Sequence, residues 1–111
     1  MSAAEQRFEQ LSGSFLSDPD VTQGTGFGSA PGLRVGGKIF AMCVKDELVV
    51  KLPKQRVDEL VAAGAGTQFD PGHGRLMKEW ASVPPESSED WERLAGEALR
   101  FVGKRSEPSV G

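Results

Sequence analysis

The sequence has 111 residues, a formal net charge of −3 at pH 7 and a single cysteine, Cys43, and these values already exclude several classes of protein. One cysteine allows no internal disulfide and no multi-cysteine metal site, and an acidic chain has no general attraction for nucleic-acid phosphates. The N-terminal residues lack the basic and apolar regions of a signal peptide, and no apolar run approaches the roughly 20 residues that span a bilayer. We therefore expect one cytoplasmic domain over residues 1–103, followed by a disordered polar tail over residues 104–111.

The first predicted element is a helix over residues 3–16. Phe8, Leu11, Phe15 and Leu16 recur at the spacing of one helical stripe, which indicates a face that covers a sheet. The sequence Ser-Asp-Pro-Asp over residues 17–20 then ends this helix, because the residue before a proline avoids the α region.

Three alternating glycines within residues 21–28 allow two interpretations. A phosphate-binding loop would place such glycines between a strand and the N-terminus of a helix, where free backbone N–H groups point at the anion. Here Pro31 and another strand pattern follow, which favours a glycine-rich edge strand or turn that another part of the chain approaches closely.

Residues 32–52 carry the strongest strand signal, because three short apolar runs are separated by the turn sequences Gly36-Gly37 and Lys45-Asp46. This pattern predicts a β-meander. If the second turn is a two-residue loop, one apolar face consists of three cross-strand pairs: Cys43 with Leu48, Ala41 with Val50, and Ile39 with Leu52. Alternation of side chains then predicts a second apolar face, made of Leu33, Val35, Phe40, Met42 and Val49.

Two helices and two strands follow the meander. Pro53 opens a helix over residues 54–63, and Gly64 supplies the left-handed residue that stops it. Short strands are predicted over residues 67–69 and 75–83, and a capping box from Ser87 to Asp90 begins a third helix. The apolar stripe of this helix consists of Trp91, Leu94, Ala95, Ala98, Leu99, Phe101 and Val102. The predicted fold class is α+β, with an antiparallel five-stranded sheet and three helices in the order α-β(3)-α-β(2)-α.

No catalytic, cofactor or metal site is predicted. His73 is the only histidine, so it lacks the partners that metal binding or triad catalysis requires, and we interpret it as a surface turn residue. Cys43 lies in an apolar run, where a thiol packs as a small hydrophobe with a raised pKa. Trp80 and Trp91 are interpreted as packing anchors, and the nearby acidic residues 79–92 as solvated or helix-capping charges.

Several short motifs nevertheless resemble a known family. They are residues 27–28, 37–42, 47–52, 77–80 and 83–84, which combine strand sequences with turn glycines. In this pattern the chain resembles the N-terminal domain of the TfoX/Sxy family, which includes bacterial regulators of competence for DNA uptake. The resemblance implies a compact α+β fold with a five-stranded antiparallel sheet, and it implies no catalytic residue.

Two functions remain open at this stage. The first is a non-catalytic bacterial regulatory or interaction module that binds a protein partner or forms a homodimer through Leu33, Val35, Phe40, Met42 and Val49. The alternative is a nucleic-acid-binding accessory domain, as competence regulation and the similar MmcQ/YjbR-type small domains suggest. A contiguous basic face would favour the nucleic-acid-binding domain, and an apolar sheet face would favour the interaction module. A deep polar pocket would favour an enzyme.

Overall fold

The computed structural model describes residues 3–25, 30–70, 77–87 and 89–106 of the chain. These residues form three helices and one antiparallel sheet of six strands. Along the chain the elements are α1 (Ala3–Phe15), β1 (Val21–Thr25), β2 (Pro31–Val35), β3 (Lys38–Val44), β4 (Glu47–Lys51), α2 (Lys54–Ala62), β5 (Thr67–Phe69), β6 (Met77–Val83) and α3 (Trp91–Ser106).

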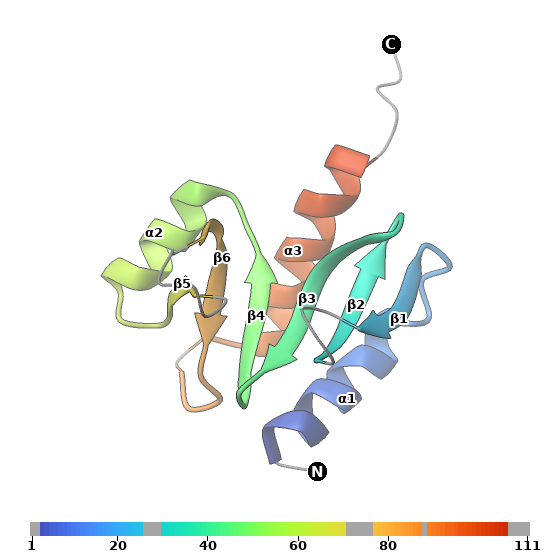
Figure 1. Cartoon of the computed structure of the whole chain (residues 1–111), viewed down its shortest axis with the longest axis horizontal. Coiled ribbons are helices and arrows are strands. Elements are labelled where there is room, and N and C mark those ends of the chain that lie inside the picture. Colours follow the sequence, from blue (N-terminus) through green and yellow to red (C-terminus); the bar gives the residue numbers. More distant parts are fainter. Residues whose placement is uncertain (1–2, 26–29, 71–76, 88, 107–111) are drawn as a thin grey trace.

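The strands lie in the order β1-β2-β3-β4-β6-β5, and Figure 1 shows them side by side. The prediction of an α+β fold with three helices is confirmed, but the prediction of five strands is wrong. The sixth strand is β1, which pairs with β2 along its whole length from Val21↔Val35 to Thr25↔Pro31. Gly24 helps this pairing, because a Cβ at that position would lie only 3.3 Å from Nε of Arg34.

The two predicted turns of the meander are confirmed. Gly36 and Gly37 have φ of 59° and 81°, and Lys45 and Asp46 have φ of 51° and 64°. Positive φ at both central residues suits a two-residue hairpin loop, because it matches the twist of the flanking strands. The resulting register pairs Cys43 with Leu48 and Ala41 with Val50, as the sequence predicts.

All three helices contribute to one apolar core on the same face of the sheet. Figure 1 shows α3 behind the middle strands, and α3 packs against β2, β3 and β4. The core includes Phe8 and Leu11 from α1, Val57 and Leu60 from α2, and Trp91, Leu94 and Ala98 from α3. Helices α1 and α2 end within one residue of their predicted limits, because their apolar stripes and stop signals are local.

Helix α3 begins and ends later than predicted. Its first residue is Trp91, and Oδ1 of Asp90 accepts a hydrogen bond of 3.0 Å from the N–H of Glu92, so Asp90 is the N-cap. Ser87 instead donates its hydroxyl to the carbonyl of Ala65 at 2.7 Å. The helix continues to Ser106, past the predicted boundary at residue 103, and residues 107–111 lie outside the described residues, so the disordered tail stays a prediction.

An arginine joins α2 to α3. Arg56 lies 2.9 Å from Glu97 of α3, 3.1 Å from Glu89 and 3.4 Å from Glu59 of its own helix. The hydrogen bond that Arg56 donates to Glu97 is the main cause that raises the pKa of Arg56 above its usual value. These contacts connect α2 with α3 and with Glu89, which precedes α3.

Candidate functional site

The five predicted interface residues do not share one face of the sheet. A β-bulge interrupts the β2–β3 pairing, because Leu33 pairs with Ala41 and Arg34 pairs with Ile39, which leaves Phe40 as an extra residue. Phe40 and Ala41 both enter the helix-side core, where the Phe40 ring meets Phe15 edge-on with centroids 6.1 Å apart. The side chains of β3 therefore stop alternating between the two faces at this point. The predicted faces of Phe40 and Ile39, which assumed strict alternation along β3, are wrong.

The bulge divides the predicted surface in two. Leu33, Val35 and Phe40 lie in the helix-side core, whereas Met42 and Val49 lie on the opposite face. All five are buried, with Val35 the most exposed at 7%. They therefore do not form one self-complementary surface, and self-association of the chain stays a prediction without support from these residues.

The face opposite the helices, which we call the open face, has its own apolar cluster. Its buried members are Met42, Val49, Phe69 and Trp80, and half-buried Ile39, Val44 and Met77 pack against them. In the described part of the chain every member of this cluster comes from strands β3, β4, β5 and β6. The apolar side chains of the open face thus pack beside one another without a described helix over them.

Polar groups border this cluster. Nζ of Lys51 lies 5.7 Å from the centre of the Trp80 ring, within the range of a cation–π contact. Arg34 donates to the carbonyl of Gly37 at 3.1 Å and to that of Thr25 at 2.9 Å. A carboxylate also lies here, because Glu47 accepts a hydrogen bond of 2.6 Å from the hydroxyl of Ser82. Lys51, Arg34 and Glu47 are thus charged residues beside strands that carry the apolar cluster.

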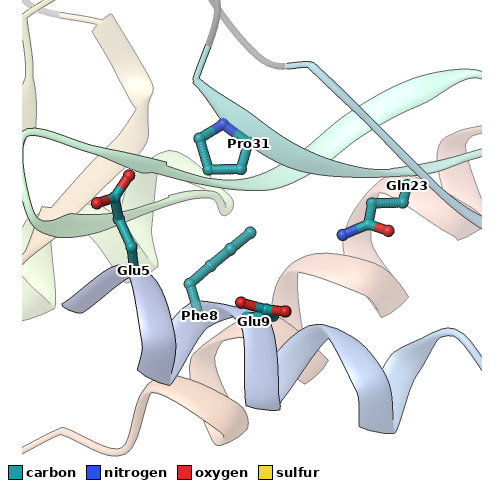
Figure 2. A pocket seen from close by; sticks show the side chains of 5 residues that line it. All are labelled: Glu5, Phe8, Glu9, Gln23 and Pro31. Carbon is teal, nitrogen blue, oxygen red and sulfur yellow. The ribbon is translucent and has the colours of Figure 1, made fainter. Parts of the chain in front are cut away.

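A small hollow lies on the helix side, between α1 and the β1–β2 hairpin. Figure 2 shows its lining, with Glu5, Phe8 and Glu9 rising from α1 towards Pro31 of β2, while Gln23 of β1 closes one side. Its volume is about 250 Å³, which is below the roughly 300–1,000 Å³ of a typical small-molecule site. Its lining combines two carboxylates, an aromatic ring, an amide and a proline.

The predicted packing role of Cys43 is confirmed. The thiol lies in the helix-side core, 4% exposed. Burial first, and then the charges of Glu5 and Asp46, raise the pKa of Cys43 to about 11. A thiol that stays protonated at neutral pH is a poor nucleophile.

The other residues considered for chemistry are dispersed or structural. Trp91 is buried and donates its indole N–H to the carbonyl of Pro84 at 3.2 Å, while the guanidinium of Arg7 lies 4.6 Å above its ring. Glu89 pairs with Arg56. His73 lies outside the described residues, and within the described ones no group of three histidine, cysteine or acidic side chains could hold a metal ion.

Sequence reasoning missed the bulge, the hollow and the pairing of Lys51 with Trp80. The hollow joins α1 to β1, and the Lys51–Trp80 contact joins β4 to β6, so both depend on tertiary placement. The one sequence feature that pointed to the Lys51–Trp80 contact was the large aromatic side chain of Trp80, which was interpreted as a packing anchor and is buried.

Comparison with known proteins identifies the family. The model of the YjbR family matches residues 16–100, which is well over half of the chain. The chain belongs to the YjbR family. The resemblance to the TfoX family was therefore wrong, because its motifs were strand sequences and turn glycines that small α+β folds share. Searches of curated proteins and of solved structures found no significant match for this YjbR chain.

The helices also bear on membrane association. None of the helices in the described residues of this YjbR chain is long and apolar enough to cross a bilayer.

Proposed function

We propose that this YjbR-family chain is a non-catalytic cytoplasmic interaction module that binds a protein partner through the open face. The observation that carries the proposal is the second apolar cluster, in which half-buried Ile39, Val44 and Met77 surround buried Trp80 and Met42 on a face without a described helix. An apolar centre with a charged rim is the usual anatomy of a protein interface. Aromatic residues and methionine are also enriched at interface centres.

The test replaces an apolar rim residue with a charge. Val44 lies beside the Lys45–Asp46 turn. The fold should therefore tolerate Val44→Glu, while the new charge disrupts an apolar contact with the partner. The matched control is Val61→Glu, because Val61 is 43% exposed on the surface of α2, away from the open face. Affinity capture from the native host, followed by quantitative mass spectrometry, should recover a partner with the wild type and the control but not with Val44→Glu.

Equal recovery by both variants, at equal melting temperature, would rule out the open face as the binding surface. Direct titration of the recovered partner then measures the loss, which we expect to be about tenfold for a charge placed at the edge of the apolar contact.

Nucleic-acid binding is the second candidate function. One observation favours it: the cations Arg34 and Lys51 border the apolar cluster of the open face. Glu47 on the same face opposes this interpretation, because a carboxylate repels phosphate. A Lys51→Gln variant distinguishes the two functions, because it should weaken nucleic-acid binding and its salt dependence but leave apolar partner binding nearly unchanged.

A further inference from the structure

Strand β4 carries opposite charges at the two ends of the open face. Glu47 pairs with Val44, and Lys51 pairs with Trp80, so both charged residues lie on the face of the second apolar cluster. Val49 lies midway between them on the same face, because alternate residues of a strand share a face. Glu47 and Lys51 are both partly exposed, whereas Val49 is buried. Along β4 the open face therefore runs from an acid through an apolar centre to a base.

The described part of the chain does not neutralise these two charges. Neither Glu47 nor Lys51 takes part in an ion pair among the described residues. The hydroxyl of Ser82 that donates to Glu47 carries no charge, and neither does the Trp80 ring beside Lys51. Because like charges that face each other across an interface are strongly repelled, a partner on the open face needs a base opposite Glu47 and an acid opposite Lys51.

The neighbouring strand β3 carries apolar residues at the matching positions. Ile39 and Val44 lie on either side of Met42, and both are half-buried members of the open-face cluster. The bulge turns Phe40 into the helix-side core and leaves Ile39 on the open face. Val44 pairs with Glu47, so it lies at the acidic end of the face, and Ile39 lies at the basic end. Each end of the open face thus has one charge and one partly exposed apolar side chain.

We propose that the occupant of the open face is the open face of a second copy, related by a two-fold axis that crosses β4 at Val49 and runs perpendicular to the strands. This axis reverses the strand direction in the second copy. Glu47 then faces Lys51 of the second copy, Ile39 faces Val44 of the second copy, and each contact occurs twice. Sheets pack about 10 Å apart face to face, a distance that a glutamate and a lysine side chain bridge together.

The charge pattern selects this arrangement over the other face-to-face dimer. A two-fold axis parallel to the strands would place Glu47 against Glu47 and Lys51 against Lys51. The buried centre at Val49 marks the position of the axis, and the partly exposed residues around it make the contact. The apolar contacts supply affinity, and the charges fix which end of one face meets which end of the other.

This inference rests on the proposed function, because it names the partner that the open face binds. The surface also differs from the one that the sequence predicts. Leu33, Val35 and Phe40 take no part in it, and Ile39 and Val44 replace them.

The test reverses the charges and measures dimerisation of the full chain by sedimentation equilibrium. Glu47→Lys and Lys51→Glu should each weaken the homodimer about tenfold or more, because both put like charges opposite each other. An equimolar mixture of the two variants should restore the dimer, and so should the double variant that exchanges both charges. Asp58→Lys, the matched control on the exposed surface of α2, should leave dimerisation unchanged. A partner other than a second copy gives no reason for recovery on mixing.

A second pair of variants applies the same logic to β3, should a reversed charge prevent folding. Ile39→Lys and Val44→Glu should each weaken the homodimer, and their mixture should regain most of the affinity. The mixed dimer keeps one contact between Ile39 and Val44 and gains one ion pair in place of the other. Melting temperatures check that each variant is folded before its mass is measured.

The outcomes separate this inference from the proposed function. A wild type that stays monomeric up to about 0.5 mM, while Val44→Glu still loses a captured host protein, would overturn the homodimer and leave the interaction module standing. A homodimer that neither reversed charge weakens, or folded single variants that stay monomeric when mixed, would overturn the two-fold arrangement. A dimer and a set of captured proteins that are both unaffected by Val44→Glu would contradict both proposals.

Discussion

The Cys43 thiol lies in the helix-side core with its pKa raised to about 11 by burial and, to a lesser extent, by Glu5 and Asp46. At pH 8 its thiolate fraction should be about 100-fold lower than that of a thiol with the ordinary value of 9.0, because each pKa unit is a factor of ten. We expect native labelling with a thiol reagent to be slow and labelling in denaturant to be fast. Rapid labelling of the native chain would contradict this.

The same shift makes stability depend on pH. The folded state holds the Cys43 proton more tightly than the unfolded state, so its contribution is complete below pH 9 and is lost as the pH rises towards 11. Cys43→Ala should remove this part of the alkaline loss in chemical denaturation. An unchanged profile between pH 8 and pH 11 in that variant would argue against it.

Two glycines should respond to alanine in opposite directions. A Cβ at Gly66 would lie 2.9 Å from the carbonyl oxygen of Ser82, so Gly66→Ala forces β5 away from β6 and should destabilise by about 1–3 kcal/mol. A Cβ at Gly13 meets nothing within 4 Å, and Gly13→Ala within α1 should stabilise by about 0.5–1 kcal/mol. Denaturant midpoints measure both, and effects of the same sign would contradict the expected packing at one site.

At the scale of elements, α3 supplies much of the core that closes the helix-side face. Leu94 is fully buried, whereas Leu99 is half-buried, so Leu94→Ala should cost about 2–5 kcal/mol and Leu99→Ala less. Thermal unfolding of the two variants gives the comparison. A larger loss for Leu99→Ala would mean that the end of α3 carries more of the packing than its burial indicates.

The contact of α2 with α3 depends on Arg56, whose side chain is 26% exposed to solvent. Solvent screens such pairs, so Arg56→Lys should cost only about 1 kcal/mol or less, through lost contact with Glu97 and Glu89. The loss should shrink at high salt. A salt-independent loss would indicate that the arginine acts by packing.

At the scale of the whole molecule, the charge balance governs binding to nucleic acid. With a formal net charge of −3 and the carboxylate of Glu47 on the open face, the chain should bind duplex DNA weakly or not at all at physiological salt. A gel shift is the measurement. Sub-micromolar binding that weakens steeply with added salt would favour the nucleic-acid function.

The fold was predictable wherever the signals were local. The Gly36-Gly37 and Lys45-Asp46 turns and the stop at Gly64 follow from backbone chemistry at single positions, and the structure confirms all of them. The faces of β3 were not predictable, because the bulge at Phe40 arises from pairing with β2 and from the space beside Phe15. The hollow depends on how α1 lies against β1. The spacing of apolar residues along the sequence predicts each element but not this packing.

The bulge allows β3 to lose one residue without a change of register on either side. If Phe40 were deleted, Ile39 and Ala41 would become neighbours, and their present partners, Arg34 and Leu33, are already adjacent. The shortened strand would keep every remaining residue on its current face, whereas a deletion elsewhere in β3 would turn part of the strand over. Loss of the Phe40 codon would thus remove one benzyl side chain from the core and leave every other side chain of β3 on its present face.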